Sequence, residues 1–227
     1  MLDGRWRAKA QHSLDPIGRG LHAIGVSADG LTVMGLVAAA GTAVLIANGN
    51  LLLGLIGLIL AGLPDLLDGS VARFSGTESK RGAFFDSVCD RVADALLLGG
   101  VAWNLNTNGS NDAILVLAVL ALTMLVSYER AKAEALGFDA RGGVMERLER
   151  LVLLGVGLAL DLLVPVMWIM LVLTAITAVH RFVMVWRQAT PPPDGTGAAD
   201  GPRRRLPRRQ RVRRSRPHRL SRVPGRR

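Results

Sequence analysis

The sequence predicts an all-α integral membrane protein, with six transmembrane helices and an N-terminal amphipathic helix that lies at the membrane interface. Half of the 227 residues are hydrophobic, and they form blocks instead of following the period of soluble amphipathic helices. Several blocks approach the roughly 20 residues that a helix needs to cross a bilayer. The blocks cover residues 31–47, 51–63, 83–103, 113–128, 151–164 and 166–186.

The second and fifth blocks are short, and each becomes long enough to cross only if neighbouring polar residues are included. These are Asp65 and Asp68 after the second block and Arg150 at the start of the fifth. Polar side chains at membrane depth usually face the interior of a helix bundle or a water-filled cavity. We therefore expect both helices to line a wet cavity.

The segment before the first block, residues 1–29, mixes four basic residues with apolar ones. A disordered leader and a short amphipathic helix on the cytoplasmic interface both fit this composition, and the alternation of charged and bulky apolar residues favours the helix. No apolar core precedes a small-residue cleavage site, so the segment does not have the pattern of a signal peptide.

The net charge of +10 belongs to the C-terminal segment, because thirteen of the 28 Lys and Arg residues are arginines between Gly201 and Arg227. Residues 189–227 are rich in Pro and Arg and have little apolar surface to bury, so we expect a disordered tail. The tail has no aromatic residue for base stacking, which argues against a nucleic-acid partner. Anionic membrane lipid is the expected partner instead. The domains predicted are therefore 1–29, the six-helix domain 30–188, and the tail.

The basic residues also predict the orientation in the membrane. No Lys or Arg occurs in residues 20–72, 92–129 or 151–180, and the expected turns near residues 48–50, 104–112 and 161–165 lie inside these spans. By the positive-inside rule, both termini face the cytoplasm, together with the residues between the second and third blocks. We expect a multi-pass protein of the cell membrane.

Four aspartates flank the turn between the second and third blocks, in the spacing Asp65-x2-Asp68-Gly69-x2-Ala72-Arg73-x8-Gly82-x3-Asp86-x3-Asp90. The first two are three residues apart and the last two are four apart, so each pair shares one face of a helix. Carboxylates at membrane depth are costly unless they are paired or bind cations. Hard oxygen ligands at this density suit Mg²⁺ or Mn²⁺, and two such ions would neutralise all four charges.

This stretch resembles the signature of the CDP-alcohol phosphotransferase family at every fixed position. The resemblance implies a metal-dependent enzyme that transfers a phosphatidyl group from CDP-diacylglycerol to an alcohol and releases CMP. It implies that Asp65, Asp68 and Asp86 are the core metal ligands, and that Asp90 contacts metal and also takes the proton of the attacking hydroxyl.

The same resemblance assigns residues to the binding of CDP-diacylglycerol. Gly69, Ala72 and Gly82 would leave room for the nucleotide, and Arg73 and Ser79 would hold the diphosphate. A segment before the first membrane helix contributes to the nucleotide pocket in that family, which adds Asp29 and Thr32. From the sequence alone, Asp29 is expected to cap this helix, with Thr32 in its first turn.

A second informative stretch is SYERAKAEALGFDARGGVMERLER, residues 127–150. Arg150 borders an apolar block and Arg181 interrupts another, and an arginine inside a transmembrane helix needs an anionic partner. Arg141 and Arg147 are interpreted as an ordinary positive flank of the membrane. The pattern SYxRAKAE…GGxxERxER resembles, within the larger family, the actinobacterial phosphatidylinositol phosphate synthases. That resemblance implies a pocket for the phosphate of inositol 1-phosphate, formed by Arg130, Lys132, Arg150 and Arg181.

Two alternatives remain open at this point. Glycerol 3-phosphate also carries a phosphate, so a basic cluster alone separates it poorly from inositol 1-phosphate as acceptor. An ion transporter could use the same carboxylates, although transporters typically contain internal repeats and no repeat is visible here. Homodimers are usual in the resembled family, so a homodimer is expected.

Overall fold

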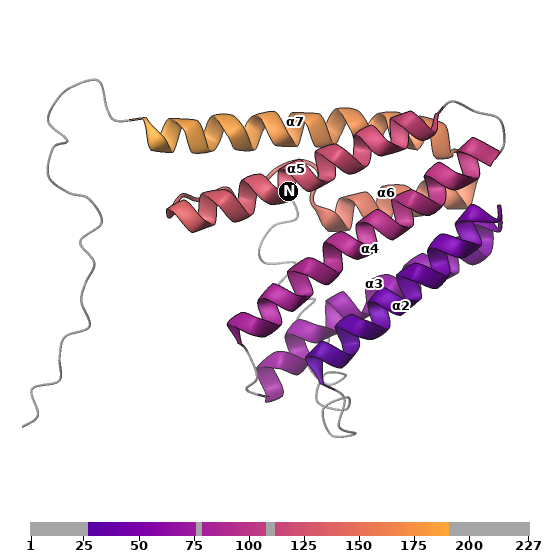
Figure 1. Cartoon of the computed structure of the whole chain (residues 1–227), viewed down its shortest axis with the longest axis horizontal. Coiled ribbons are helices and arrows are strands. Elements are labelled where there is room, and N and C mark those ends of the chain that lie inside the picture. The colour runs from indigo at the N-terminus through magenta and orange to yellow at the C-terminus, as the bar shows by residue number, and fades with distance from the viewer. Residues whose placement is uncertain (1–26, 76–78, 108–111, 191–227) are drawn as a thin grey trace, which may run out of the picture. The chain divides into compact units, whose positions relative to one another are not determined.

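The computed structural model describes residues 27–75, 79–107 and 112–190, except for the side chains of residues 65–75. Within this part of the chain every regular element is a helix (Figure 1). The helices are α2 (Ala28–Ala47), α3 (Leu51–Ser75), α4 (Lys80–Thr107), α5 (Ala113–Leu136), α6 (Arg147–Leu160) and α7 (Leu163–Ala189). The all-α class is therefore confirmed. Residues 1–26 of the predicted N-terminal segment (1–29) and residues 191–227 of the predicted tail (189–227) lie outside the described residues.

The six apolar blocks all form helices, but the start of the first helix differs from the expectation. Ser27 caps α2, because its extended backbone lets Oγ accept a hydrogen bond of 3.1 Å from the Gly30 N–H. Asp29 instead lies in the first turn, where its negative charge still favours the helix N-terminus. The prediction of Asp29 as the cap is therefore wrong, since Ser27 offers a good capping side chain two residues earlier.

Three helices, α2, α5 and α7, are long and apolar enough to cross a membrane. The apolar part of α3, Leu51–Pro64, is shorter. Helix α6 has 14 residues, a length of about 21 Å at 1.5 Å per residue, against roughly 30 Å for the hydrocarbon core. These lengths and compositions support a membrane protein, and the count of six spans stays a prediction.

Small residues let the first three helices approach closely. Helix α2 contacts both α3 and α4. A Cβ on Gly57 would collide with Oγ1 of Thr42, and a Cβ on Gly100 would lie 2.5 Å from the carbonyl oxygen of Ala43. Close backbone contact at small residues is the usual way in which helices pack inside a bilayer, where no hydrophobic effect drives them together.

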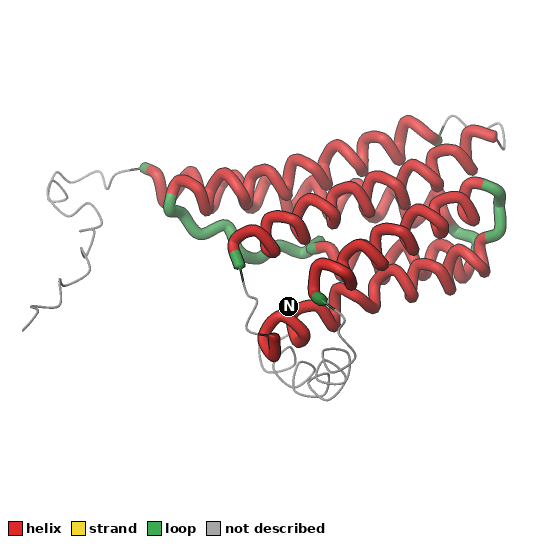
Figure 2. The backbone as a smooth tube through the Cα atoms, turned by 60° about the horizontal axis from the view of Figure 1, so that its bottom comes forward, coloured by secondary structure: helices red, strands yellow, loops and turns green. Residues whose placement is uncertain are grey.

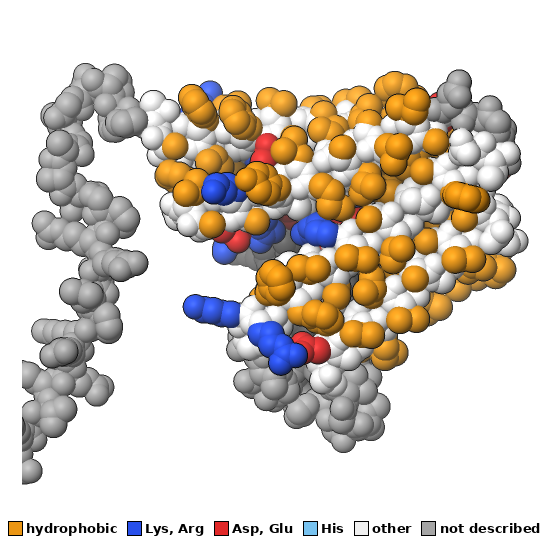
Figure 3. Space-filling view, in the orientation of Figure 1, with side chains coloured by type: hydrophobic (Ala, Val, Ile, Leu, Met, Phe, Trp, Pro, Cys, Tyr) orange, Lys and Arg blue, Asp and Glu red, His pale blue; other side chains and the backbone are white. Residues whose placement is uncertain are grey.

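Helices α5, α6 and α7 form the rest of the bundle. Helix α5 contacts α7 and α4, and α6 contacts α7 and α3. Many large apolar side chains lie on the outer surface, over most of the face that Figure 3 shows. An apolar surface of this extent fits contact with lipid.

The up-and-down order of the helices divides the bundle into two ends (Figures 1 and 2). One end holds the starts of α2, α4 and α6 and the ends of α3, α5 and α7, and we call it the motif end. The opposite end holds the turns at residues 48–50 and 161–162. Both informative stretches of the sequence, residues 65–90 and 127–150, therefore come to the motif end.

Candidate active site

The motif end carries the aspartates at the end of α3 and the start of α4. The backbone of α3 is helical through Asp65 and Asp68, whose side chains lie outside the described residues, as do those of Ala72 and Arg73. On α4, Asp86 and Asp90 are both partly buried. Among the described residues no three acidic, His or Cys side chains are grouped as for a metal ion. The two described aspartates offer the hard oxygen ligands that Mg²⁺ and Mn²⁺ prefer, so this half of the proposed ligand set fits such an ion.

The starts of α2 and α4 lie side by side at this end. Ser79 Oγ accepts a hydrogen bond of 3.0 Å from the Gly82 N–H and so caps α4. A Cβ on Gly82 would lie 3.3 Å from that oxygen and 3.7 Å from Oδ1 of Asp29. The structure thus brings together three of the residues predicted for CDP-diacylglycerol. Asp29 is exposed here, whereas Thr32 is buried and its hydroxyl donates to the carbonyl of Ala28 at 3.2 Å.

A ladder of alternating charges joins α4 to α6. Asp90 Oδ1 lies 2.7 Å from Nη1 of Arg147. The Nε of Arg147 lies 3.7 Å from Oδ1 of Asp94, and Nη2 of Arg150 donates to Oδ2 of Asp94 at 2.8 Å. The ladder therefore runs from Asp90 to Arg147, Asp94 and Arg150, and its inner members, Asp94 and Arg150, have side chains only 5% and 6% exposed.

Two members of this ladder escaped the sequence interpretation. Arg147 was interpreted as an ordinary membrane flank, but it contacts the proposed catalytic carboxylate, so that interpretation is corrected. Asp94 lies outside the fixed positions of the aspartate signature and was missed. It continues the four-residue spacing of Asp86 and Asp90 along one face of α4, and that spacing was the available indication.

The two arginines expected to need an anionic partner both find partners within the protein. Arg150 pairs with Asp94. Arg181, with a side chain 4% exposed, donates to the backbone carbonyls of Gly142 at 2.9 Å and Val126 at 3.0 Å, and lies 3.7 Å from Oε1 of Glu146. The protein itself therefore supplies partners for both buried arginines, and a bound anion is an additional hypothesis.

Arg181 is one of three α7 residues that hold the loop between α5 and α6. Thr177 Oγ1 accepts the N–H groups of Val144 and Met145 at 3.2 and 3.0 Å. Gln188 exchanges two hydrogen bonds with the backbone of Asp139. Gly143 has a φ of +146°, and a Cβ there would lie 2.5 Å from Cγ2 of Thr177. The loop is thus fixed along the last turns of α7, and Arg147, which follows it, lies in contact with α4.

The remaining basic residues predicted for the acceptor phosphate lie on the last turns of α5. Arg130 is exposed and pairs with Glu134 at 3.1 Å, and Lys132 is also exposed. Figure 3 shows Lys and Arg side chains gathered in a hollow between helices at this end. Arg130 and Lys132 thus lie on the last turns of α5, whereas the buried Arg150 and Arg181 lie on α6 and α7, and a common pocket for the four stays a prediction.

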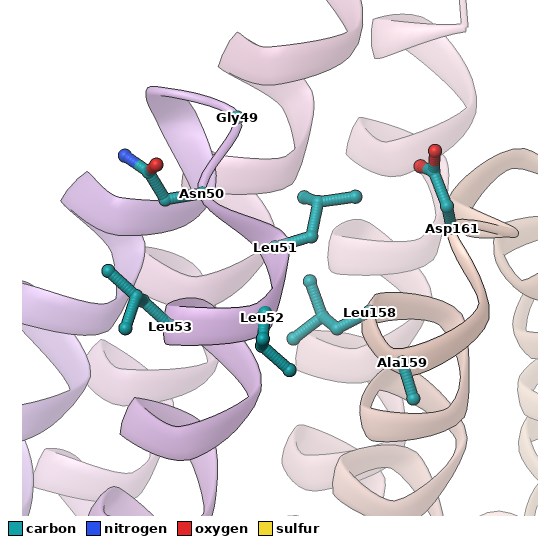
Figure 4. A pocket seen from close by; sticks show the side chains of 8 residues that line it. All are labelled: Gly49, Asn50, Leu51, Leu52, Leu53, Leu158, Ala159 and Asp161. Atoms are coloured by element: carbon teal, nitrogen blue, oxygen red, sulfur yellow. The ribbon is translucent and has the colours of Figure 1, made fainter.

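A shallow, open hollow at the opposite end has a different character. It is lined by Gly49, Asn50, Leu51, Leu52, Leu53, Leu158, Ala159 and Asp161. Figure 4 shows leucines of α3 and α6 facing one another across it, with the Asp161 carboxylate at the rim. A single carboxylate beside leucines offers no set of groups for a chemical step, so we place the candidate active site at the motif end.

The chain is similar to several curated phosphatidylinositol phosphate synthases. The chain is 37% identical over 193 residues to a phosphatidylinositol phosphate synthase of Mycobacterium marinum, covering 79% of this chain and 82% of the relative. A protein of the same name from Streptomyces avermitilis is 34% identical, with 87% and 88% covered. An archaetidylinositol phosphate synthase of Methanothermobacter thermautotrophicus is 32% identical, with 81% and 94% covered.

Solved structures of a phosphatidylinositol phosphate synthase are also similar to this chain. The phosphatidylinositol phosphate synthase of Mycobacterium tuberculosis with CDP-DAG bound is similar at a TM-score of 0.71 and 33% identity, covering 76% of this chain and 93% of that one. The same enzyme in complex with manganese and citrate also gives a TM-score of 0.71. The family model described as CDP-alcohol phosphatidyltransferase matches residues 26–186. The predicted family is confirmed: the chain belongs to the CDP-alcohol phosphatidyltransferases.

Proposed function

We propose that this protein transfers the phosphatidyl group of CDP-diacylglycerol to inositol 1-phosphate, giving phosphatidylinositol phosphate and CMP. The family supports a phosphatidyltransferase, and relatives at 34–37% identity that are named for phosphatidylinositol phosphate synthesis support the acceptor. The bound CDP-DAG of the mycobacterial structure supports the donor.

The reaction needs a divalent cation, for which the manganese-bound relative gives a precedent. Asp65, Asp68, Asp86 and Asp90 would hold Mg²⁺ or Mn²⁺, and we propose two ions because four carboxylates then become neutral. When bound, such ions stabilise the charge that develops on the attacking and leaving oxygens during phosphoryl transfer.

The protein's own residues would bind and orient the two substrates and take up the proton of the acceptor hydroxyl. The hydroxyl oxygen of the acceptor attacks the phosphorus of the phosphatidyl group, the bond to the bridging oxygen breaks, and CMP leaves. Asp90 would take the hydroxyl proton. Gly69, Ala72 and Gly82 would admit the nucleotide, with Asp29 and Thr32 at the start of α2. Arg73 and Ser79 would hold the diphosphate, Arg73 through charge-assisted hydrogen bonds.

The acceptor phosphate would lie among Arg130, Lys132, Arg150 and Arg181. Arg150 reaches the site from the start of α6, and Arg130 and Lys132 from the end of α5. The contact between Asp90 and Arg147 supports this placement, because the ladder then connects the proposed base to Arg150 through Arg147 and Asp94.

The protein would lie in the cell membrane with its site on the cytoplasmic side. Six spans, an interfacial helix within residues 1–29, a cytoplasmic tail from residue 189 and a homodimer complete the proposed arrangement. The diacyl chains could then stay in the bilayer while the headgroup enters a cytoplasmic cavity.

The observation that carries the proposal is the charge ladder, in which a candidate base, the partly buried Arg147 and the buried Arg150 meet at one contact between α4 and α6. The test is CMP release by detergent-purified protein with CDP-diacylglycerol and a panel of acceptors: inositol 1-phosphate, free inositol, glycerol 3-phosphate and serine. We expect inositol 1-phosphate to be preferred. A preference for glycerol 3-phosphate would change the acceptor, and no CMP release with any of them would contradict the transferase function.

A further inference from the structure

Asp94 is a buried carboxylate without an assigned role in the reaction. Its side chain is 5% exposed, and its two oxygens serve different arginines of α6. Oδ2 accepts a hydrogen bond of 2.8 Å from Arg150, and Oδ1 lies 3.7 Å from Nε of Arg147. Arg147 in turn lies 2.7 Å from Asp90. One carboxylate therefore connects the proposed base with the proposed phosphate-binding arginine.

Stability alone does not account for this arrangement. Replacing a buried ion pair by well-packed apolar residues is often neutral or stabilising, because desolvation of both charges is costly. An ion pair also fixes the orientation of its side chains, since the planar guanidinium donates hydrogen bonds to a carboxylate in only a few geometries. Arg147 and Arg150 stand at the start of the 14-residue helix α6, after a loop. Their side chains therefore need a fixed point on α4, and Asp94 provides it.

We propose that Asp94 is a positioning residue, which orients Arg150 toward the acceptor phosphate and, through Arg147, sets that phosphate relative to Asp90. The inference rests on the proposed function, because it gives Arg150 a ligand. It adds a residue that contacts neither the donor nor the metal and that acts on acceptor affinity through the two arginines.

The test compares Asp94→Glu with the wild type in the full-length, detergent-purified protein. The longer side chain keeps the charge and the ion pair, but moves the carboxylate outward by one methylene. We expect a single monomodal peak in size-exclusion chromatography, an acceptor KM raised about tenfold, as when one charge-assisted hydrogen bond is weakened, and a KM for CDP-diacylglycerol changed less than twofold. Asp161→Asn is the control for the Asp94→Asn variant used below, since it makes the same change at the opposite end, at a residue whose φ of 54° suits Asn.

A double-mutant cycle gives a second measurement. Asp94→Asn and Arg150→Gln should each raise the acceptor KM. The double variant should lose clearly less than the sum of the two single losses, because Asp94 acts in part through Arg150. Additive losses would contradict the positioning role, because they would mean that Asp94 acts on the acceptor independently of Arg150.

The outcomes separate the two proposals. A wild type that releases no CMP with any acceptor contradicts the proposed function. A wild type that works with glycerol 3-phosphate changes the acceptor, and the Asp94 comparison is then made with that phosphate. If the wild type is active but Asp94→Glu keeps the wild-type acceptor KM, or if both Asp94 variants fail to fold, Asp94 serves the fold alone and the positioning role is wrong.

Discussion

The two ends of the helix bundle differ in what they bury. At the motif end, Asp94, Arg150 and Arg181 are buried with partners, and Asp90 and Arg147 are largely covered. At the opposite end, short turns join the helices, and leucines line the hollow between α3 and α6. Buried charge is costly unless it is paired and hydrogen-bonded, whereas an open hollow lined mainly by leucines buries no charge. The comparison teaches that a hollow alone is poor evidence for a site, and that charges buried with partners indicate it better.

The largest effect should come from the proposed metal ligands. Asp86→Asn removes a negative ligand, so turnover should fall at least about a hundredfold, since a loss of about 3 kcal/mol of transition-state stabilisation suffices for that. Mn²⁺ binding, followed by isothermal titration, should weaken in parallel. Asp65→Asn and Asp68→Asn should behave in the same way.

The matched control is again Asp161→Asn, the same chemical change at the opposite end. It should retain wild-type turnover and Mn²⁺ affinity. Full activity in Asp86→Asn would mean that Asp86 is not a metal ligand. Turnover would then be equally insensitive to the change at both ends of the bundle.

Asp90→Asn should separate proton transfer from binding. Catalysis should be lost by a factor of roughly 10² to 10⁴, the usual contribution of a positioned base. CDP-diacylglycerol binding should largely remain, because three other carboxylates hold the metal. The measurement pairs CMP release with equilibrium binding of the donor. A donor affinity that falls in step with the rate would mean that Asp90 is only a ligand.

Arg150→Gln and Arg181→Gln should have smaller, acceptor-specific effects. Each removes a charge-assisted bond worth about 1.5–3 kcal/mol, so the acceptor KM should rise roughly tenfold to a hundredfold while the KM for CDP-diacylglycerol changes little. Free inositol should mimic the mutations, and the two losses should not add. Loss of donor affinity alone would contradict the acceptor pocket.

The folding stability of the two arginine variants should also differ. Arg150→Gln leaves the buried Asp94 with only the more distant Arg147 as counter-ion, 3.7 Å away, so folding stability should fall, by up to the roughly 3–5 kcal/mol typical of a broken buried ion pair. Arg181 mainly donates to backbone carbonyls, so its loss should loosen the loop of residues 137–146 instead. Thermal unfolding of both variants should therefore accompany the kinetics, with Arg150→Gln the less stable variant.

The fold was predictable from the sequence because it depends on local patterns. Each apolar block forms a helix, and the two informative stretches reach the same end since antiparallel helices alternate direction. The start of α2 was missed by two residues, because Ser27 competed with Asp29 as the cap and only the backbone geometry decides between them.

The candidate site was predictable only where its residues belong to one motif. Asp86, Asp90, Ser79 and Gly82 stand in a fixed spacing. The partner of Asp94, in contrast, is 56 residues away in the sequence. No local pattern indicates that Arg147 and Arg150 turn toward α4, because the loop fixed by Thr177 and Arg181 determines this, and those contacts form only in the folded bundle.

The smallest effect should come from the basic tail, which carries no residue of the proposed site. Deleting residues 191–227 should leave the catalytic constant in detergent unchanged, since no motif residue lies there. In vesicles with anionic lipid the deleted protein should lose peripheral attraction, because each arginine near such a surface contributes about 1 kcal/mol. The measurement compares CMP release in detergent, neutral vesicles and anionic vesicles for both proteins. A loss of activity in detergent, where surface charge on lipid plays no role, would mean that the tail contributes to the fold or to the site, and the active unit would then extend beyond the helices described here.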